Sequence, residues 1–358
     1  MSITAGCSDD GPVTPPAPVS AWQEVDLGTP YADSRLQVVG INGDHGWAGG
    51  WGRVHGADQA PGPFFFRMQP DGSWVQDPFG ELPALAGFLP RGLAVEPDGG
   101  IVLAGLDFGN IALPCMVYDA RGDLHFSVAR AGFGLWTLDG GGTFMVAGGS
   151  SRGGTLWTSA APGQWPADDL PLTGSNDSGF RDVHVVGDRA VACGFDDGAD
   201  TLQVILTRTA GTGWSKVDLA GSGLNLDTLQ AVAMTDGGAI FVGGIEAAGG
   251  REAQAFLSLR DAAGEWTAIV LPEPVALGGI NDILIAGDGS IYLACSGEPG
   301  LDPDATIIHA TESGVVRELP PFPGQMLQLA EAPGGTIYAV GVRHGVGEGT
   351  AVMFRRAP

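Results

Sequence analysis

Three arginines at equivalent places in a repeating sequence form a candidate anion-binding set. Gly-containing hairpin turns recur along the chain, and the residue seven positions before each turn defines one register. Arginine fills this register three times among only sixteen arginines in the chain; the full set is Arg35, Arg91, Gly132, Arg181, Leu229, Asn281 and Met326. A guanidinium group presents a planar fork of donors that fits a carboxylate, sulfate or phosphate. If the repeats surround an axis, the three guanidinium groups converge there and bind one anion.

Acidic neighbours allow a second interpretation of these arginines. Asp33 lies two residues before Arg35, and Asp182 follows Arg181 directly. Ion pairs with such carboxylates would neutralise the guanidinium groups and leave no anion site. The sequence leaves both interpretations open.

Loops after the second strand of each predicted repeat extend the candidate site. Together with Asn281 and the three arginines, the ligand-binding candidates are Trp51, Arg53, His55, Arg343 and His344. Charged side chains beside exposed aromatic rings suit a sugar-binding surface. His55 and His344 fall in neighbouring repeats, but no third His or Cys is placed beside them, so a transition-metal site is not favoured.

An acidic loop is a candidate calcium site. Asp196, Asp197 and Asp200 could supply oxygen ligands to Ca²⁺. The segment lacks the EF-hand pattern, so a solvated turn is the competing interpretation. Calcium is the only cofactor that the sequence suggests.

No recognisable catalytic set accompanies these candidates. The segment 149–153 fits G-x-S-x-G formally, but it lies on a predicted hairpin loop and not between a strand and a helix. No G-K-[ST] phosphate loop is present. The sequence therefore favours a binding protein over an enzyme.

The residues 229–266 show the element that must position these side chains. They read as two strands around a TDGG turn, a third strand after a Gly-rich loop, and a Trp that opens a fourth. Similar units recur at about 50 residues, as repeat folds do. The turns between the first two strands lie at Asn42-Gly43, Asp98-Gly99, Asp139-Gly140, Gly187-Asp188, Asp236-Gly237, Asp288-Gly289 and Pro333-Gly334. Such Gly-containing turns predict seven hairpins and hence seven units.

The second strands are apolar on both faces, as expected for sheets sandwiched between neighbouring sheets. They are predicted at 45–51, 101–107, 143–150, 189–196, 239–246, 290–297 and 336–343. A fourth strand opens with Trp74, Trp165, Trp214 or Trp266 in four units. The last unit ends after its third strand, and 22–27 resembles the fourth strand at 214–219. We expect this N-terminal strand to complete the last unit.

The chain resembles seven-bladed β-propellers of the kelch and BNR (sialidase-like) repeat kind over 22–358. Gly49-Gly50, Gly148-Gly149 and Gly243-Gly244 are similar to the kelch double glycine, and the turns before Trp74 and Trp266 are similar to the end of the Asp-box. The resemblance implies an all-β fold of four-stranded antiparallel blades at about 35–79, 91–129, 132–170, 180–219, 228–271, 278–319 and 326–356 plus 22–27. Sialidases hold a substrate carboxylate with an arginine triad, so the resemblance also implies an alternative function, a sialidase-like hydrolase or polysaccharide lyase.

Composition limits the partners. The formal net charge of −24 argues against nucleic acid and anionic membrane surfaces as partners, because binding phosphates draws on clustered Lys and Arg. Such acidity favours a soluble monomer or a component of a larger assembly. Cys115, Cys193 and Cys295 lie in separate apolar strands and are expected to be buried thiols.

Residues 1–21 form a separate segment. Thr4-Ala5-Gly6-Cys7 resembles the end of a bacterial lipoprotein signal, with Cys7 as the lipidated residue, although only six residues precede it. The Pro-rich stretch that follows predicts a disordered tether. We therefore expect an extracytoplasmic protein of the bacterial cell envelope, lipid-anchored or secreted, which binds a protein partner or an acidic glycan.

Overall fold

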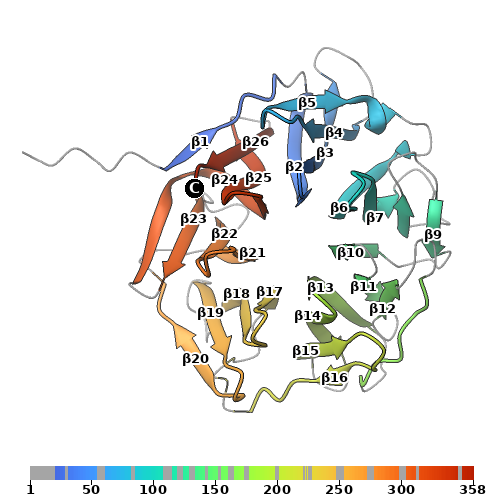
Figure 1. Ribbon diagram of the computed structural model, residues 1–358, viewed down its shortest axis with the longest axis vertical. Helices are drawn as coiled ribbons and strands as arrows, with labels where there is room; N and C mark the ends of the chain where they lie inside the picture. The colour runs from blue at the N-terminus through green and yellow to red at the C-terminus, as the bar shows by residue number, and fades with distance from the viewer. Residues whose placement is uncertain are drawn as a thin grey trace, which may run out of the picture.

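The chain folds into antiparallel β-sheets arranged around a central axis (Figure 1). The computed structural model describes residues 21–28, 31–54, 61–81, 85–107, 115–118, 124–128, 134–141, 144–151, 155–159, 165–172, 177–197, 201–220, 222, 224, 228–246, 254–271, 278–297, 304–311, 314–345 and 349–358. Strands dominate these residues, and the 3₁₀ helix η1 (Pro78–Glu81) is short. Among the described residues, no helix is long and apolar enough to cross a membrane. The all-β prediction is confirmed.

Three of the sheets contain four strands each, in chain order from the axis outward. The first comprises β2 (Tyr31–Asn42), β3 (His45–Val54), β4 (Gly62–Met68) and β5 (Trp74–Asp77). The second comprises β6 (Phe88–Val95), β7 (Ile101–Asp107), β8 (Cys115–Tyr118) and β9 (Leu124–Val128). The third comprises β17 (Thr228–Met234), β18 (Ile240–Glu246), β19 (Gln254–Arg260) and β20 (Trp266–Ile269).

Two larger sheets contain seven strands each. One comprises β10 (Gly134–Gly141), β11 (Phe144–Ser151), β12 (Thr155–Ser159), β13 (Asp177–Val186), β14 (Arg189–Asp197), β15 (Thr201–Thr209) and β16 (Ser215–Lys216). The other comprises β1 (Trp22–Glu24), β21 (Gly278–Ile285), β22 (Ile291–Gly297), β23 (Asp304–Thr311), β24 (Gly314–Ala332), β25 (Thr336–His344) and β26 (Gly349–Arg356). The 19-residue strand β24 runs from beside β23 to beside β25 and so belongs to two successive units.

The innermost strands contact one another in the order β2, β6, β10, β13, β17, β21 and β24, and β24 in turn contacts β2. Strand β1 pairs with β26 through Trp22↔Arg356 and Glu24↔Phe354, so both ends of the chain lie in one sheet. This is the pairing that the N-terminal strand was expected to make.

Side chains on both faces of each sheet fill the space between neighbouring sheets. In β4, Phe64, Phe65 and Phe66 are all buried although they alternate in direction. Cys193 and Cys295 are buried free thiols, as predicted, and burial raises the pKa of Cys295 to about 12. The described part of the core thus consists of apolar layers between sheets, as the two-faced apolar strands predict.

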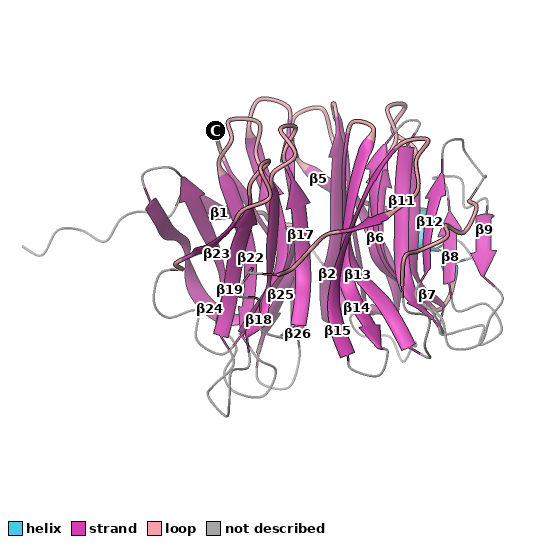
Figure 2. Cartoon of the chain, turned by 90° about the horizontal axis from the view of Figure 1, so that it is seen from below, coloured by secondary structure: helices cyan, strands magenta, loops and turns pink. Residues whose placement is uncertain are grey.

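Hairpin turns lie where the sequence predicts them. Gly43 and Gly187 have φ of 57° and 59°, which glycine adopts at little cost. Near Asp236-Gly237 it is Gly238 that has positive φ, at 87°. In Figure 2 these short turns lie together at one end of the strands, which we name the turn face.

The fourth strand predicted to open at Trp165 does not form. The segment makes only an isolated bridge, Trp157↔Ala167. Pro166 and Pro171 lack the N–H that a ladder needs, which explains the loss of regular pairing. Trp165 is nevertheless buried, so its side chain still packs in the hydrophobic core.

Candidate functional site

A β-bulge in every innermost strand places one residue per strand around the axis. At each bulge the pairing with the second strand slips by one residue, and the slipped residues are Gln37, Arg91, Trp136, Arg181, Gln230, Asn281 and Leu327. A bulge bends the strand locally and redirects a side chain. We call these residues the bulge ring. All of them except Gln230 line a cavity of about 170 Å³ on the axis, the mouth cavity.

The predicted register is correct for Arg91, Arg181 and Asn281 and wrong for the other strands. Gln37 and not Arg35 is the bulge residue of β2, and Trp136, Gln230 and Leu327 replace Gly132, Leu229 and Met326. The error arises because the turns differ in length. Gly43 lies in a two-residue turn between β2 and β3, whereas five residues separate β21 from β22 where they close around Gly289.

Arg35 still lies beside the mouth cavity. Burial lowers the pKa of Arg91, and the positive charge of Arg35 lowers this pKa further, as expected for two neighbouring guanidinium groups. In the amide orientation that satisfies both neighbours, Arg35 Nε donates to Gln37 at 3.0 Å and Gln37 donates to Pro90 O at 2.7 Å. Gln37 therefore links Arg35 to the strand that carries Arg91.

The arginine set carries uncompensated charge. Burial is the main cause that lowers the pKa of Arg35, Arg91 and Arg181. In the described part of the chain none of the three forms an ion pair; the arginines that do are Arg67, Arg208, Arg343 and Arg356. Arg181 lies over the ring of Phe195 at 5.8 Å. The pairings of Arg35 with Asp33 and of Arg181 with Asp182 are thus not formed.

Asp182 instead belongs to a layer of carboxyl groups deeper on the axis. Its Oδ2 accepts from Val232 N of the next strand at 2.8 Å. Asp139 Oδ2 accepts from Val185 N, and Asp282 Oδ2 accepts from Leu329 N, both at 2.7 Å. Asp139, Asp182 and Asp282, which we name the carboxyl girdle, line a second axial cavity of about 280 Å³. Each carboxylate satisfies the backbone of its neighbour strand.

Burial makes two members of the girdle, Asp182 and Asp282, hard to ionise. Desolvation raises the pKa of Asp282 to about 7, with a further upward contribution from the charge of Asp139. Desolvation, followed by the charge of Asp282, raises the pKa of Asp182 well above its usual range. Cationic groups at the mouth thus lie above two carboxyl groups, those of Asp182 and Asp282, whose pKa values are raised toward or above neutral pH.

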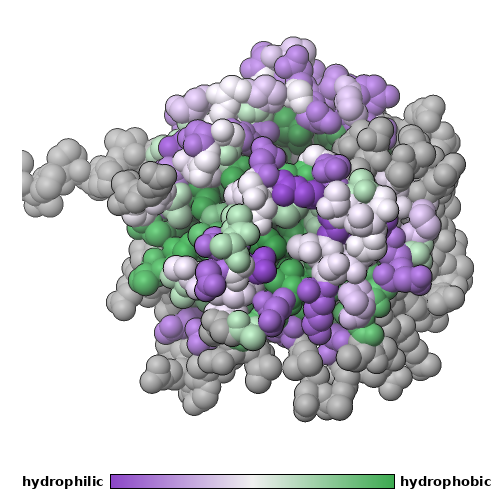
Figure 3. Space-filling view, turned by 60° about the horizontal axis from the view of Figure 1, so that its bottom comes forward, coloured by the Kyte–Doolittle hydropathy of each residue, from purple (hydrophilic) through white to green (hydrophobic). Residues whose placement is uncertain are grey.

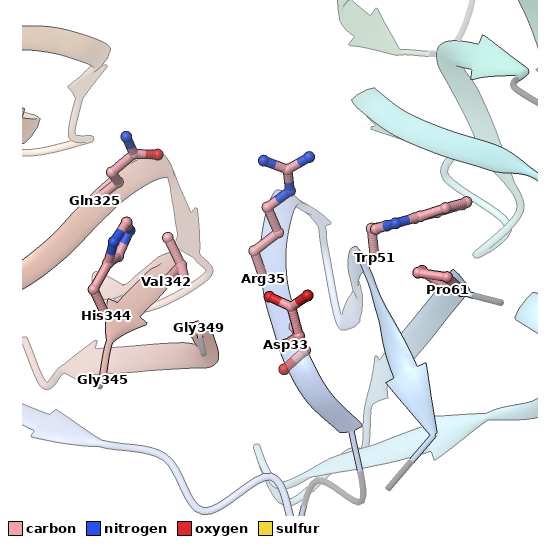
Figure 4. Close-up of a pocket in the computed structure, with 10 residues that line it drawn as sticks. Asp33, Arg35, Trp51, Pro61, Gln325, Val342, His344, Gly345 and Gly349 are labelled. Atoms are coloured by element: carbon pink, nitrogen blue, oxygen red, sulfur yellow. The ribbon is translucent and has the colours of Figure 1, made fainter. Parts of the chain in front are cut away.

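A wider cavity of about 740 Å³ opens beside the mouth, between β2–β3 and β24–β26. Figure 4 shows Arg35 rising between Trp51 on one side and Gln325 and His344 on the other. Its guanidinium points away from the carboxylate of Asp33. Asp33 has φ of 47°, a left-handed conformation that is uncommon for residues other than glycine. Arg35 therefore borders this cavity as well as the mouth.

The other candidates lie elsewhere or outside the described residues. Arg343 pairs with Glu24 at 2.8 Å and lies over Phe322, so its charge is already matched. Arg53 is exposed on β3. Cys7, His55, Asp200 and the side chain of Asp197 lie outside the described residues. The three-arginine site remains a prediction that the geometry makes more specific.

The described residues do not form a set of metal ligands at the predicted calcium site. Asp196 is 1% exposed and accepts a hydrogen bond from Ser178 Oγ at 3.0 Å. Within the described ranges no group of three His, Cys, Asp or Glu residues could hold a metal ion. Calcium binding stays an untested prediction.

Sequence reasoning missed the carboxyl girdle and Trp136. A signal for the girdle was present, because an aspartate follows the bulge residue in both Arg181-Asp182 and Asn281-Asp282. Each of these aspartates precedes an alternating apolar stretch, where a polar residue needs a partner.

No protein-family model and no curated protein sequence matches the chain. Solved structures do match it. One is YCF48 bound to D1 peptide, at TM-score 0.60 and 11% identity, covering 96% of this chain and 99% of that chain. A chain of the mitotic checkpoint complex matches at TM-score 0.51 and 11% identity over 100% of both chains. Pyrococcus horikoshii acylaminoacyl peptidase matches at TM-score 0.51 and 10% identity, over 89% of this chain and 52% of that chain. At such low sequence identities, the structural similarity shows only the fold, which is that of a β-propeller.

Proposed function

We propose that this β-propeller is a binding or scaffold protein whose mouth holds an acidic group of a protein partner. The observation that carries the proposal is the set of three arginines at the mouth, Arg35, Arg91 and Arg181. None of them forms an ion pair with a carboxylate among the described residues, although the charge of Asp33 acts on Arg35. An anion from outside would supply the missing countercharge. The peptide in the YCF48 structure and the assembly in the checkpoint structure support a protein partner.

The position of the carboxyl girdle favours an acidic side chain over a freely penetrating anion. Asp182 and Asp282 lie directly below the mouth cavity and line it. An anion that moved deeper would leave the guanidinium groups for buried carboxyl groups that offer it no positive charge, which costs free energy. The acidic group is therefore held at the mouth, while Trp51 and His344 in the neighbouring cavity contact the rest of the ligand.

The alternative ligand is the carboxylate of an acidic glycan, which the same three arginines would hold. A glycan-active enzyme would add catalytic groups to that site. Binding experiments with a peptide and a glycan separate the two ligands.

Replacing Arg35, Arg91 and Arg181 together by glutamine is expected to weaken binding of a capped hexaglutamate peptide at least roughly 10-fold, because each lost charged hydrogen bond contributes about 1.5 to 3 kcal/mol. Isothermal titration calorimetry measures the change. Arg355→Gln is the matched control, because Arg355 is exposed on β26. Polygalacturonate is titrated in parallel. Unchanged affinity for both probes in a folded triple variant rules out the arginine site, and binding of polygalacturonate alone points to a glycan.

The finer architecture that we propose is seven blades, one for each innermost strand. The ring of strand contacts and the pairing of β1 with β26 support this number. In that arrangement the two seven-stranded sheets are each two adjacent blades joined by local pairing. A kinship with kelch or BNR repeats rests on the double glycines and turn motifs of the sequence.

We further propose that Cys7 anchors the protein in the bacterial cell envelope through a lipid. The motif Thr4-Ala5-Gly6-Cys7 supports this. Expression with the full native start in a bacterial host should give a membrane-associated, lipid-modified protein, and Cys7→Ser should abolish the modification. Intact-mass spectrometry reads both; an unmodified Cys7 in the wild-type membrane fraction argues against the anchor.

A further inference from the structure

A recurring cluster of Trp, Arg and carboxylate joins neighbouring units at the outer edge of the molecule. Trp22 pairs across strands with Arg356, and both donate to Glu318 of the preceding unit, with N···O distances of 3.0 Å and 2.9 Å. Trp214 and Arg208 likewise both donate to Asp168 of the preceding unit. In each case the carboxylate neutralises a half-buried arginine and satisfies an indole N–H.

The same Trp and Arg occur a third time without the carboxylate. Arg260 pairs across strands with Trp266, and the indole donates to a backbone oxygen, Asp218 O, at 3.3 Å. Arg260 forms no hydrogen bond or ion pair within the described residues, and its Nε is buried without an acceptor there. A buried guanidinium N–H without an acceptor is costly, so this site has an unmet requirement.

Strand pairing identifies the residue that replaces the carboxylate. Asp168 N donates to Leu156 O at 2.9 Å, and Val217 N donates to Ile205 O at the same distance, at equivalent points of successive units. Val217 therefore stands where Asp168 stands one unit earlier. A buried valine cannot accept a hydrogen bond from Arg260.

A cavity of about 540 Å³ lies at this place, between β15–β16 and β18–β19. Arg189, Arg208, Lys216 and Arg260 line it, with Asp218 and the hydroxyl-bearing residues Thr207 and Ser215. Arg208 is already paired with Asp168, and Asp218 Oδ1 accepts from Ala220 N at 2.9 Å. Lys216 is the only lysine of the chain, and in a protein of net charge −24 the gathering of four cations beside one carboxylate in one cavity is unusual. Figure 1 places β16 and β20 at the outer edge, and Figure 3 turns this side forward, where strongly hydrophilic residues lie between hydrophobic ones.

We propose that this cavity binds a carboxylate supplied from outside the chain, which completes the third Trp, Arg and carboxylate cluster. The carboxylate accepts from Arg260 Nε in the way that Glu318 accepts from Arg356, and Lys216 adds a second positive charge. The site lies at the outer edge and is separate from the mouth cavity, so the two sites can be occupied independently.

The indole N–H resonance of Trp266 reports on the site in every variant, because Trp266 is the cross-strand partner of Arg260. Titration of the full chain with the capped tripeptide Gly-Asp-Gly should shift this resonance, whereas capped Gly-Asn-Gly should not. Arg260→Gln should weaken the aspartyl peptide roughly 10-fold, the value expected for a charged hydrogen bond. Arg355→Gln should leave its affinity unchanged. Acetate distinguishes the source: equal affinity means that a free carboxylate suffices, and a tighter peptide indicates a polypeptide ligand.

A second variant supplies the missing group from within the chain. Val217→Asp should pair with Arg260, abolish the peptide-induced shift and keep a Tm near that of the wild type. Ile269→Asp is the matched control, because Ile269 occupies the corresponding place one unit later, where Ala310 replaces the arginine. It should lower the Tm more than Val217→Asp does. Three results would each overturn the proposal: wild-type peptide affinity in Arg260→Gln, wild-type peptide affinity in Val217→Asp, or a shift of the resonance with Gly-Asn-Gly. None of these results depends on the arginines of the mouth.

Discussion

Glu318→Ala is expected to lower the free energy of unfolding by about 3 to 5 kcal/mol, the range seen when one partner of a buried ion pair is removed. Glu318 is 14% exposed and receives Arg356 Nε at 2.9 Å and Trp22 Nε1 at 3.0 Å. His309 Nδ1 lies 2.8 Å from its other oxygen. The variant would leave all three partners without this acceptor.

The location of Glu318 makes the effect larger than that of an ordinary ion pair. Trp22 belongs to the N-terminal strand β1, Arg356 to the C-terminal strand β26, and Glu318 to the outer part of β24. The carboxylate thus ties both ends of the chain to the preceding unit. Arg356 and His309 also lie against the ring of Tyr292, at 5.4 Å and 4.4 Å between centres, so a change at Glu318 reaches the aromatic core.

Urea denaturation tests this prediction, because the midpoint and slope of the transition give the free energy of unfolding. Glu265→Ala is the control, because Glu265 is exposed and should change stability by less than about 0.5 kcal/mol. Trp22→Phe, which keeps an aromatic ring and removes the indole N–H, should cost about 1 kcal/mol. A Glu318→Ala midpoint no lower than that of Glu265→Ala would show that the cluster does not hold the ends together.

The second large effect is a loss of stability as pH rises from about 4 to 7, caused by the carboxyl girdle. Burial raises the pKa of Asp282 from 3.8 to about 7 in the folded protein. Between these values the folded state binds more protons than the unfolded state, so the free energy of unfolding falls with rising pH. The contribution of protonated Asp282 to the free energy of unfolding is fully present below pH 3.8 and is lost as the pH rises past about 7. Its size is on the order of 4 kcal/mol, at about 1.4 kcal/mol for each pKa unit.

Asp282→Asn removes this titration. The variant should be less stable than the wild type at pH 5, because it loses an acceptor for Ile283 N, and its disadvantage should shrink or reverse at pH 8. Thermal unfolding at both pH values measures the difference. Asp288→Asn is the control: hydrogen bonds from Ser290 lower the pKa of Asp288, so its stabilising contribution is constant above pH 5. A Tm difference for Asp282→Asn that is the same at pH 5 and pH 8 would contradict the girdle assignment.

Strand positions could be predicted well because they depend on local patterns. The apolar runs at 101–107 and 336–343 became β7 and β25 within one residue, and glycines with positive φ occupy most of the predicted turns. The arginine site was harder to predict than the strands, because one inserted turn residue moves a side chain to another place along the axis. Arg91 and Arg181 were therefore assigned correctly, while Arg35 was placed two residues from the true bulge at Gln37.

Contacts between units could not be predicted from patterns within one unit. Asp168 and Val217 occupy equivalent places, and Glu318 lies at a bulge in its own strand, between Arg317 and Leu319. The sequence around these three residues shares no motif, and the segment that holds Asp168 is interrupted by proline. The equivalence of Asp168 and Val217 becomes visible only when the backbone pairing of successive sheets is compared. The unmet hydrogen bond of Arg260 follows from that comparison and not from its own sequence neighbourhood.

The hydrogen bonds between the innermost strands also determine which parts of a ligand the protein can recognise at the axis. Side chains of Asp139, Asp182, Asp282 and Gln328 accept from backbone N–H groups that would otherwise face the channel. An inner strand whose N–H groups are occupied offers no template for β-augmentation, in which an extended peptide adds to a free sheet edge. A partner that reaches the axis must therefore be recognised through its side chains or its terminus, and its own backbone must be satisfied by water or by the loops around the mouth.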